Sequence, residues 1–511
     1  MISTSAVPQP DTASGPQRPA RSVWLPMPLL RALRRGLDRV PPRVLAWSIA
    51  ALFAVLYSAM SIRRHERMLS AGYDLGIFEE EIRAYAHFRA PIVALKGPGY
   101  NILGDHFSPI LALLGPVYRV FPSPLTLLIA QAVLMSLACV PLTIWAHRVR
   151  GPLAALVVGL GVGASWGIVK AASFDFHEVA VAVPLIAFSA TALGNRRWLA
   201  AALWALPLVL VKEDLGLTAA VVGGYIAWYG RAEGRRTRLL GIGLAVFGTA
   251  ASLVEMFVIL PAMNPHDGFA YLDQMPGAGA GHGGVAHQLL FALLHLGWPP
   301  VKWLLLLMLL LPSAFVGLRS PLTLLCLPTL AWRLLSDNPH YWGVSYHYSA
   351  VLMPMVFAGL VDAIRPERRG LRGRPPLTRR QVRLALAGSA AFTAITVPIY
   401  PLHEPLSPSV WTESAHVRVA RQILALIPSG TTVASSNHLA AQLTDRTTVS
   451  LVCAPILPGR PLPQWVVSDT TDPTHVPCEP ALSAQLVAQY RADGYRTVAD
   501  RDGIILLQRP S

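Results

Sequence analysis

The sequence predicts an all-α, polytopic membrane protein that ends in a small α/β domain, and three observations lead to this class. Of the 511 residues, 53% are hydrophobic and only 14% are charged, whereas soluble domains carry roughly 25% charged residues. Apolar runs that approach the roughly 20 residues needed to cross a bilayer recur along the chain. After the last of these runs the composition turns polar, with short β-like segments between helical patterns.

The apolar runs define the expected membrane topology, with about 11 transmembrane helices inside residues 43–400. The expected spans are 44–62, 124–146, 152–169, 179–193, 198–211, 216–229, 239–260, 301–318, 321–335, 349–364 and 384–399. Residues 1–42 are expected to form a disordered, basic cytoplasmic tail, and residues 63–123 the first external loop. Because the run 110–121 is short and interrupted, we expect a helix at the membrane interface there rather than a span.

The charge distribution supports this topology. The net charge is +15, almost all of it from Arg, and the Arg residues lie in short turns between apolar runs. Placing these turns in the cytoplasm puts the Asp, Glu and His clusters on the external side. We therefore expect a multi-pass plasma-membrane protein with a cytoplasmic N-terminus, an extracytoplasmic C-terminal domain and no nucleic-acid partner.

That C-terminal domain is expected at residues 401–511. Short β-like runs occur at 431–434, 465–467 and 503–507, and helical patterns at 413–427 and 481–493. Cys453 and Cys478 lie in this region and are candidates for a disulfide if it stands outside the cell. Cys139 and Cys326 lie in apolar runs, where a free thiol behaves as a small core residue.

Two acidic positions in the first external loop are candidate site residues. Asp74 follows the first span. It is either an N-cap of the helix that follows, or a catalytic base or metal ligand. Asp105 and His106 precede the interfacial helix. Either Asp105 or Ser108 caps that helix, or this position makes a second contact to a metal or a phosphate.

The segment Ser173–Glu178 places two carboxylates and an imidazole between two apolar runs. Ionisable groups beside membrane-spanning helices are costly and by default suggest a function. On a helix, Asp175 and Glu178 would share one face, with His177 beside them. Interfacial hydrogen bonding is one interpretation. The other is acid–base chemistry or binding of a divalent cation such as Mg²⁺ or Mn²⁺, which carboxylates with one His suit better than zinc.

Two further polar clusters fall on the external side. Lys212-Glu213-Asp214 is either a self-neutralising cluster or a site where Lys212 binds a lipid-linked phosphate. Tyr346 and His347 follow the ninth expected span. An aromatic belt accounts for the tyrosine, whereas the histidine favours substrate contact.

Residues 261–288 form a Gly- and His-rich loop. His266, Asp267 and the glycines of 276–284 are expected to form a mobile cover over the site. These glycines are not a nucleotide site, because no strand precedes them.

The chain order resembles the GT-C glycosyltransferase fold, which includes protein O-mannosyltransferases, aminoarabinose transferases and the catalytic subunit of oligosaccharyltransferase. The matching features are Asp74 in the first external loop, the 173–178 motif in the second, and a C-terminal external domain. More closely, Tyr73–Phe78, Gly104–Pro109 and Phe174–Glu178, together with Lys212-Glu213-Asp214, resemble an uncharacterised family of prokaryotic predicted membrane proteins over roughly residues 45–400. The chain departs from the GT-C pattern because no Asp-X-Asp pair follows Asp74 and because His177 lies inside the second motif.

The resemblance implies a polyprenyl-phosphate-linked sugar as donor and an unidentified glycan or protein as acceptor. Asp74 would then activate the acceptor hydroxyl. Asp175, His177 and Glu178 would position a divalent ion or the acceptor, and Lys212 and His347 would hold the departing lipid phosphate. The alternatives are a transporter or lipid flippase, in which the same residues line a translocation path, and a non-catalytic envelope-assembly protein.

Overall fold

The computed structural model describes residues 36, 38–264, 294–367, 373, 375–454, 462–474 and 477–510. The chain divides into two compact units, Met1–Val40 and Pro41–Ser511. Most of the expected tail, together with His266, Asp267 and the loop 276–284, lies outside the described residues.

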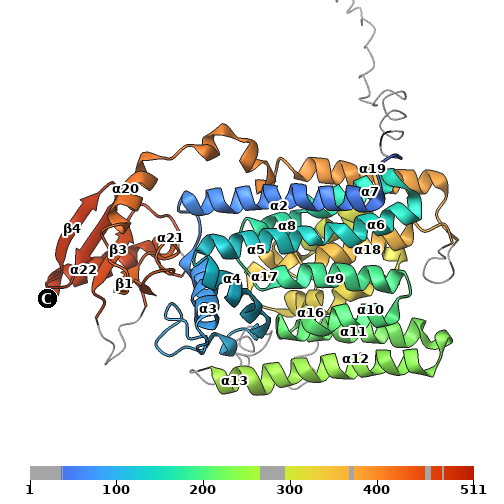
Figure 1. Cartoon of the computed structure of the whole chain (residues 1–511), viewed down its shortest axis with the longest axis horizontal. Helices are drawn as coiled ribbons and strands as arrows, with labels where there is room; N and C mark the ends of the chain where they lie inside the picture. Colours follow the sequence, from blue (N-terminus) through green and yellow to red (C-terminus); the bar gives the residue numbers. More distant parts are fainter. Residues whose placement is uncertain are drawn as a thin grey trace, which may run out of the picture. The chain divides into compact units, whose positions relative to one another are not determined.

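Every expected span falls on helix, because a backbone among apolar side chains satisfies its polar groups most readily within its own helix (Figure 1). The α-helices in these spans are α2 (Pro42–Glu66), α5 (Pro124–Leu137), α6 (Cys139–Arg150), α7 (Pro152–Gly163), α8 (Trp166–Ala172), α9 (Val179–Gly194), α10 (Trp198–Ala205), α11 (Leu215–Tyr229), α12 (Arg235–Val254), α15 (Val301–Leu310), α16 (Leu327–Leu335), α18 (Leu352–Ala363) and α19 (Arg379–Thr396). Within the described parts of the chain, four helical stretches are long and apolar enough to cross a membrane: Pro42–Glu66, Pro124–Arg150, Pro152–Ala172 and Arg235–Met263. Most of the remaining helices are apolar but shorter, so the expected number of spans stays a prediction.

Small residues allow neighbouring helices to approach closely. The hairpin of α11 and α12 is built this way (Figure 1). A Cβ added to Gly223 would lie 2.4 Å from the Ala245 amide nitrogen, and one added to Gly248 would lie 2.4 Å from the Gly216 carbonyl oxygen. In lipid, helices have no hydrophobic driving force for association. Glycines at such crossings allow the close van der Waals packing that stabilises the helix pair instead.

Residues 63–123, which are expected to form the first external loop and are called the first loop from here on, contain several short helical elements. A π-helical turn at Gly72–Gly76 leads directly into α3 (Ile77–Ala86). The expected interfacial segment is a 3₁₀ turn (Pro109–Leu114) followed by α4 (Gly115–Val120). Its helical character agrees with the sequence, and its position relative to a membrane stays a prediction.

The C-terminal region contains a five-stranded sheet with the strand order β2-β1-β3-β5-β4. Its elements are α20 (Ala415–Leu424), β1 (Thr432–Ser435), α21 (Asn437–Ala440), β2 (Thr448–Leu451), β3 (Trp465–Asp469), α22 (Pro480–Ala492), β4 (Arg496–Arg501) and β5 (Ile504–Gln508). Strands β1, β2 and β3 are parallel, and β5 runs antiparallel to both β3 and β4. The predicted strands and helices correspond to β1, β3, β5, α20 and α22. The polar edge strand β4 lacks the apolar alternation that would have predicted it.

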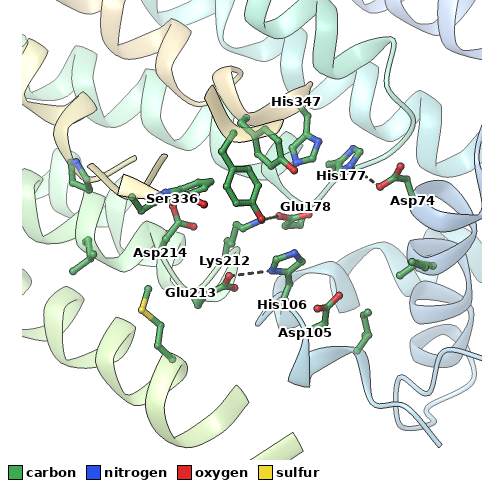
Figure 2. Close-up of a pocket in the computed structure, with 18 of the residues that line it drawn as sticks. Asp74, Asp105, His106, His177, Glu178, Lys212, Glu213, Asp214, Ser336 and His347 are labelled. Carbon is green, nitrogen blue, oxygen red and sulfur yellow. Dashed lines mark hydrogen bonds and ion pairs between the residues drawn. The ribbon is translucent and has the colours of Figure 1, made fainter. Parts of the chain in front are cut away.

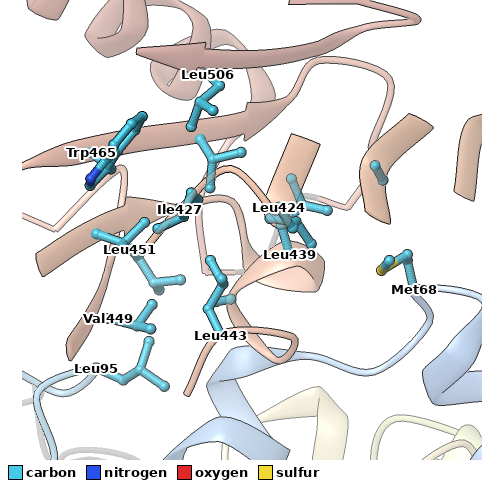
Figure 3. Close-up of a cluster of buried hydrophobic side chains, with 14 of the residues drawn as sticks. Met68, Leu95, Leu424, Ile427, Leu439, Leu443, Val449, Leu451, Trp465 and Leu506 are labelled. Carbon is cyan, nitrogen blue, oxygen red and sulfur yellow. The ribbon is translucent and has the colours of Figure 1, made fainter. Parts of the chain in front are cut away.

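The sheet shares its hydrophobic core with the first loop. Leu424, Leu439 and Leu443 from the C-terminal region pack in one cluster with Met68 and Leu95 (Figure 3). All five side chains are at most 8% exposed. The loop after α2 and the last hundred residues therefore form one packed structure.

A disulfide joins Cys453, just after β2, to Cys478, just before α22, with the two Cα atoms 5.6 Å apart. The two cysteines are 25 residues apart in sequence, and β3 lies between them. Cys139 and Cys326 are free and buried.

Replacing Leu443 with Ala is expected to destabilise the C-terminal region together with the first loop. Leu443 is fully buried, and truncating a buried leucine costs about 2–5 kcal/mol. The measurement is thermal unfolding of the purified protein in detergent. Leu482→Ala on α22, where Leu482 is 42% exposed, is the control and should leave the unfolding midpoint within about 2 °C, since surface substitutions stay near zero. Equal loss in both variants would contradict the shared core.

Candidate functional site

A cavity of about 540 Å³ lies where the first loop, the 173–178 segment and the turn before α11 meet (Figure 2). Its ionisable lining residues are Asp74, Lys96, Asp105, His106, His177, Glu178, Lys212, Glu213, Asp214, Tyr73, Tyr341, His347 and Tyr348. Apolar side chains from α11, α16 and the end of the α12 segment complete the wall: Leu217, Met256, Phe257, Pro328, Ala331 and Leu335. The cavity is therefore charged on one side and apolar on the other.

Lys212 and Glu178 form the most buried ion pair of the cavity, with Lys212 Nζ 2.8 Å from Glu178 Oε1. The side chain of Glu178 is only 1% exposed. Burial raises the pKa of this carboxyl, but Lys212 and then His106 outweigh it and lower the pKa to about 2. Pro207 in the 3₁₀ turn Leu206–Leu210 ends α10 and leads the chain into this position.

Glu213 holds the segment 96–107 against the same turn, and a further ion pair lies within that segment. His106 Nδ1 lies 3.1 Å from Glu213 Oε1, and the Phe107 amide donates to Glu213 Oε2 at 3.2 Å. Lys96 Nζ lies 2.9 Å from Asp105 Oδ2. Burial and the Lys212 charge act to lower the pKa of His106, but the carboxylates of Glu213 and Asp105 outweigh them and raise it.

Asp74 and His177 form the third contact, with Asp74 Oδ1 3.3 Å from His177 Nε2. The Asp74 side chain is 29% exposed and that of His177 only 4%, so the carboxylate faces the cavity and the imidazole backs it. The His177 amide donates to Gln131 at 3.0 Å, and its ring stacks on His347 with centroids 3.6 Å apart. Burial, then the His177 charge, lowers the pKa of His347 well below its ordinary value.

Asp175 does not line this cavity. The 173–178 segment is a turn between α8 and α9, not a helix, and Asp175 has a left-handed φ of 61°. The expectation that Asp175 and Glu178 share a helical face is therefore wrong. The Asp175 carboxylate instead accepts from the Ala71 amide at 2.8 Å. Burial, then the nearby Asp74, raises the pKa of Asp175 to about 6.

The three residues expected to bind a divalent cation thus face different partners. Glu178 pairs with Lys212, His177 with Asp74, and Asp175 with the Ala71 backbone. Among the described residues no three His, Cys, Asp or Glu side chains are grouped as ligands of one ion. As arranged, Asp175, His177 and Glu178 do not fit Mg²⁺ or Mn²⁺, and we derive no chemistry through a metal.

Of the remaining expected residues, Asp105, His106, Lys212, Glu213 and His347 line the cavity. Tyr346 is not a lining residue, and its ring packs edge-on against Phe174 with centroids 5.1 Å apart.

The cavity also contains residues that the sequence did not single out as site residues. Lys96 is one of only four lysines in the chain, and that rarity was the available signal. Asp214 accepts from the indole of Trp332 at 2.8 Å. Tyr341 and Tyr348 pack edge-on with centroids 4.8 Å apart. No local pattern distinguishes these aromatic residues from an aromatic belt.

The fold is that of a GT-C-like membrane protein. The structure is similar to a crystal structure of ArnT from Cupriavidus metallidurans bound to undecaprenyl phosphate, with a TM-score of 0.50 and 14% identity over 90% of this chain and 99% of that chain. It is also similar to ArnT from the same organism in the apo state, with a TM-score of 0.50 and 13% identity over 91% and 98% of the two chains. At this identity the likeness establishes the fold alone.

The chain belongs to the family described as "Predicted membrane protein (DUF2079)", which matches residues 64–506. Both the family and the GT-C-like fold confirm the resemblance seen in the sequence. None of the curated proteins matches the chain significantly.

Replacing Lys212 with Ala is expected to destabilise the protein by about 3–5 kcal/mol, because it leaves the buried Glu178 carboxylate without its counter-charge. The Glu178→Gln/Lys212→Ala double variant should recover most of that loss. Thermal unfolding in detergent at pH 7 measures both. Because the pKa of folded Glu178 lies below its unfolded value, its contribution is present at pH 7 and is lost as the pH falls toward 2. A double variant no more stable than the single one would contradict this account.

Proposed function

We propose that the protein is a membrane glycosyltransferase that moves a sugar from a polyprenyl-phosphate-linked donor to an acceptor at the external face of the membrane. The observation that carries this proposal is the two-sided cavity. Its charged wall suits a phosphate and a sugar, and its apolar wall between α11, α16 and the end of the α12 segment suits an isoprenoid tail. Few ligands other than a lipid-linked polar group need both surfaces at once.

The cations and the carboxylates of the cavity wall are suited to different parts of the donor head group. Lys212 contributes three N–H donors, one of which meets Glu178, and Lys96 adds a second cation. These ammonium groups and His106 are suited to the phosphate. Carboxylates exceed lysines in the lining by five to two. Since carboxylates accept hydrogen bonds, we assign Asp105, Glu213 and Asp214 to the sugar hydroxyls.

Asp74 is placed to act as the general base. Its carboxylate is exposed to the cavity, and His177 behind it fixes its orientation. In the proposed step Asp74 takes the proton of the acceptor hydroxyl while the acceptor oxygen bonds to the anomeric carbon. The bond from that carbon to the phosphate oxygen breaks, and the polyprenyl phosphate leaves with the electron pair, stabilised by Lys212.

Two further observations support this assignment. The similar ArnT structure contains undecaprenyl phosphate, which is a lipid of the proposed class. The Arg-rich turns, placed in the cytoplasm, put the cavity residues on the external side. The acceptor, whether glycan or protein, is not specified by the cavity.

Replacing Asp74 with Asn is expected to lower kcat by about 10²- to 10⁴-fold, the usual contribution of a general base. The measurement is release of polyprenyl phosphate from a radiolabelled lipid-linked sugar by protein in nanodiscs. Asp500→Asn is the matched control, because Asp500 pairs with Arg491 at the surface of the C-terminal region. Full activity in Asp74→Asn would exclude the general-base role. Transbilayer movement of the donor without release of phosphate would instead favour a flippase.

Replacing Ala331 with Trp is expected to fill the apolar side of the cavity and to raise KM for a long-chain donor about tenfold or more, with a smaller effect on a donor with a short lipid chain. Leu324→Trp serves as control, because Leu324 is 47% exposed and does not line the cavity. Steady-state kinetics with donors of two chain lengths provide the measurement. Equal effects on both donors would place the lipid elsewhere.

A further inference from the structure

We propose that Asn437, in the C-terminal region, is a positioning residue for Asp74. Through it the extracytoplasmic domain would set the geometry of the Asp74–His177 pair. This inference rests on the proposed function, because it assigns a role to Asp74, and its structural part can be tested without any activity.

Asp74 lies on an irregular turn that is also bonded by side chains from elsewhere in the chain. The turn Gly72–Gly76 is irregular, and Tyr73 within it has non-helical backbone angles of φ −83° and ψ 41°. Its backbone amides find side-chain partners from far along the chain. The Tyr73 amide donates to Asn437 Oδ1 at 2.9 Å, and the Ala71 amide donates to Asp175 Oδ2 at 2.8 Å. Both amides belong to residues that shortly precede Asp74 in the chain.

The turn also packs directly on α21, the short helix that Asn437 begins. A Cβ added to Gly72 would lie 2.5 Å from the Ala440 Cβ and 3.3 Å from the Asn437 carbonyl oxygen. Such distances allow no side chain at residue 72 unless the two segments move apart. Glycine at this position is therefore required by the contact itself.

Asn437 is held rigidly where it makes this bond. Ser436 is the single residue between β1 and Asn437, and it is hydrogen-bonded to β3. The Ser436 amide donates to the Val467 carbonyl at 3.0 Å, and its hydroxyl accepts from the Asp469 amide at 3.1 Å. Because β1 and β3 are interior strands of the sheet, the position of the Asn437 side chain is fixed by the sheet.

The surrounding contacts show that this interface is extensive. Thr444 Oγ1 donates to the buried Glu79 at 2.6 Å. Gln442 Nε2 donates to the His65 carbonyl at 3.0 Å. Together with the shared core (Figure 3), these contacts fix the C-terminal region against the segment from the end of α2 to α3.

The geometry of the Asp74–His177 pair is sensitive to small displacements of the Gly72–Gly76 turn. Asp74 and His177 are 3.3 Å apart, and neither ring nitrogen of His177 has a well-aligned hydrogen bond among the described residues. Misplacing a reacting group by about 1 Å can cost 10²-fold in rate. A shift of the Gly72–Gly76 turn would therefore lower the rate of the chemical step while leaving Lys212 in place, because Lys212 is held by Glu178 on another segment.

The test compares Asn437→Ala with Gln442→Ala, which removes a bond across the same interface that does not reach the Asp74 turn. The first readout is amide hydrogen exchange of residues 70–76 in the full-length protein in nanodiscs. Exchange should rise about fivefold in Asn437→Ala, since one hydrogen bond is lost, and should stay unchanged in Gln442→Ala. Asn437→Asp keeps an acceptor oxygen and should restore slow exchange.

The second readout is kinetic. In Asn437→Ala kcat should fall about 10- to 100-fold with KM for the donor unchanged, whereas Gln442→Ala should stay within about twofold. If Asn437→Ala does not fold, Gly72→Ala displaces the same turn and should give the same kinetic result.

The two readouts separate the two proposals. Unchanged exchange in Asn437→Ala, or equal behaviour of the Asn437 and Gln442 variants, would overturn the positioning role. If the wild-type protein transfers no sugar, but amide exchange of residues 70–76 still rises in Asn437→Ala and not in Gln442→Ala, only the proposed function is overturned.

Discussion

The compensation of buried charge is the constraint on which this site depends. Glu178, Lys212 and Glu213 are each at most 9% exposed in a chain that is 53% hydrophobic. A buried charge persists only when another charge or a hydrogen bond pairs with it. The Lys212–Glu178, His106–Glu213 and Asp74–His177 pairs each join segments that are distant in sequence. These pairs therefore form only once α9, the turn before α11 and the first loop have assembled. The cavity is therefore a product of the whole helical assembly.

The sequence contained enough information to predict most of the helices and the composition of the site. Apolar runs located the helices because burial in lipid or among other helices leaves the backbone few alternatives. Clusters of charge between those runs located Asp74, Asp105, His106, His177, Glu178, Lys212, Glu213 and His347, all of which line the cavity. Charge is rare enough in this chain for each cluster to stand out.

What the sequence could not predict were the pairings. The spacing of Asp175 and Glu178 suggested one helical face, but local backbone geometry reverses the direction of Asp175 and turns it toward Ala71. Lys212 has two acidic neighbours in sequence, yet its close partner is Glu178. Such choices depend on which elements meet in space. Likewise, the α/β character of the C-terminal region was predictable from its β-like runs, whereas its common core with the first loop was not.

That common core constrains how the chain is threaded. Residues around 68–102 and 417–506 fill a single hydrophobic cluster, and one globular core cannot extend across a lipid bilayer. Both segments must therefore lie in the same compartment, so the chain between them crosses the membrane an even number of times. Ten expected spans follow the first, which is an even number when residues 110–121 do not cross the bilayer. Counting 110–121 as a further span would make the number of crossings odd. Tertiary packing at the two ends of the chain thus limits the topology independently of the distribution of arginines.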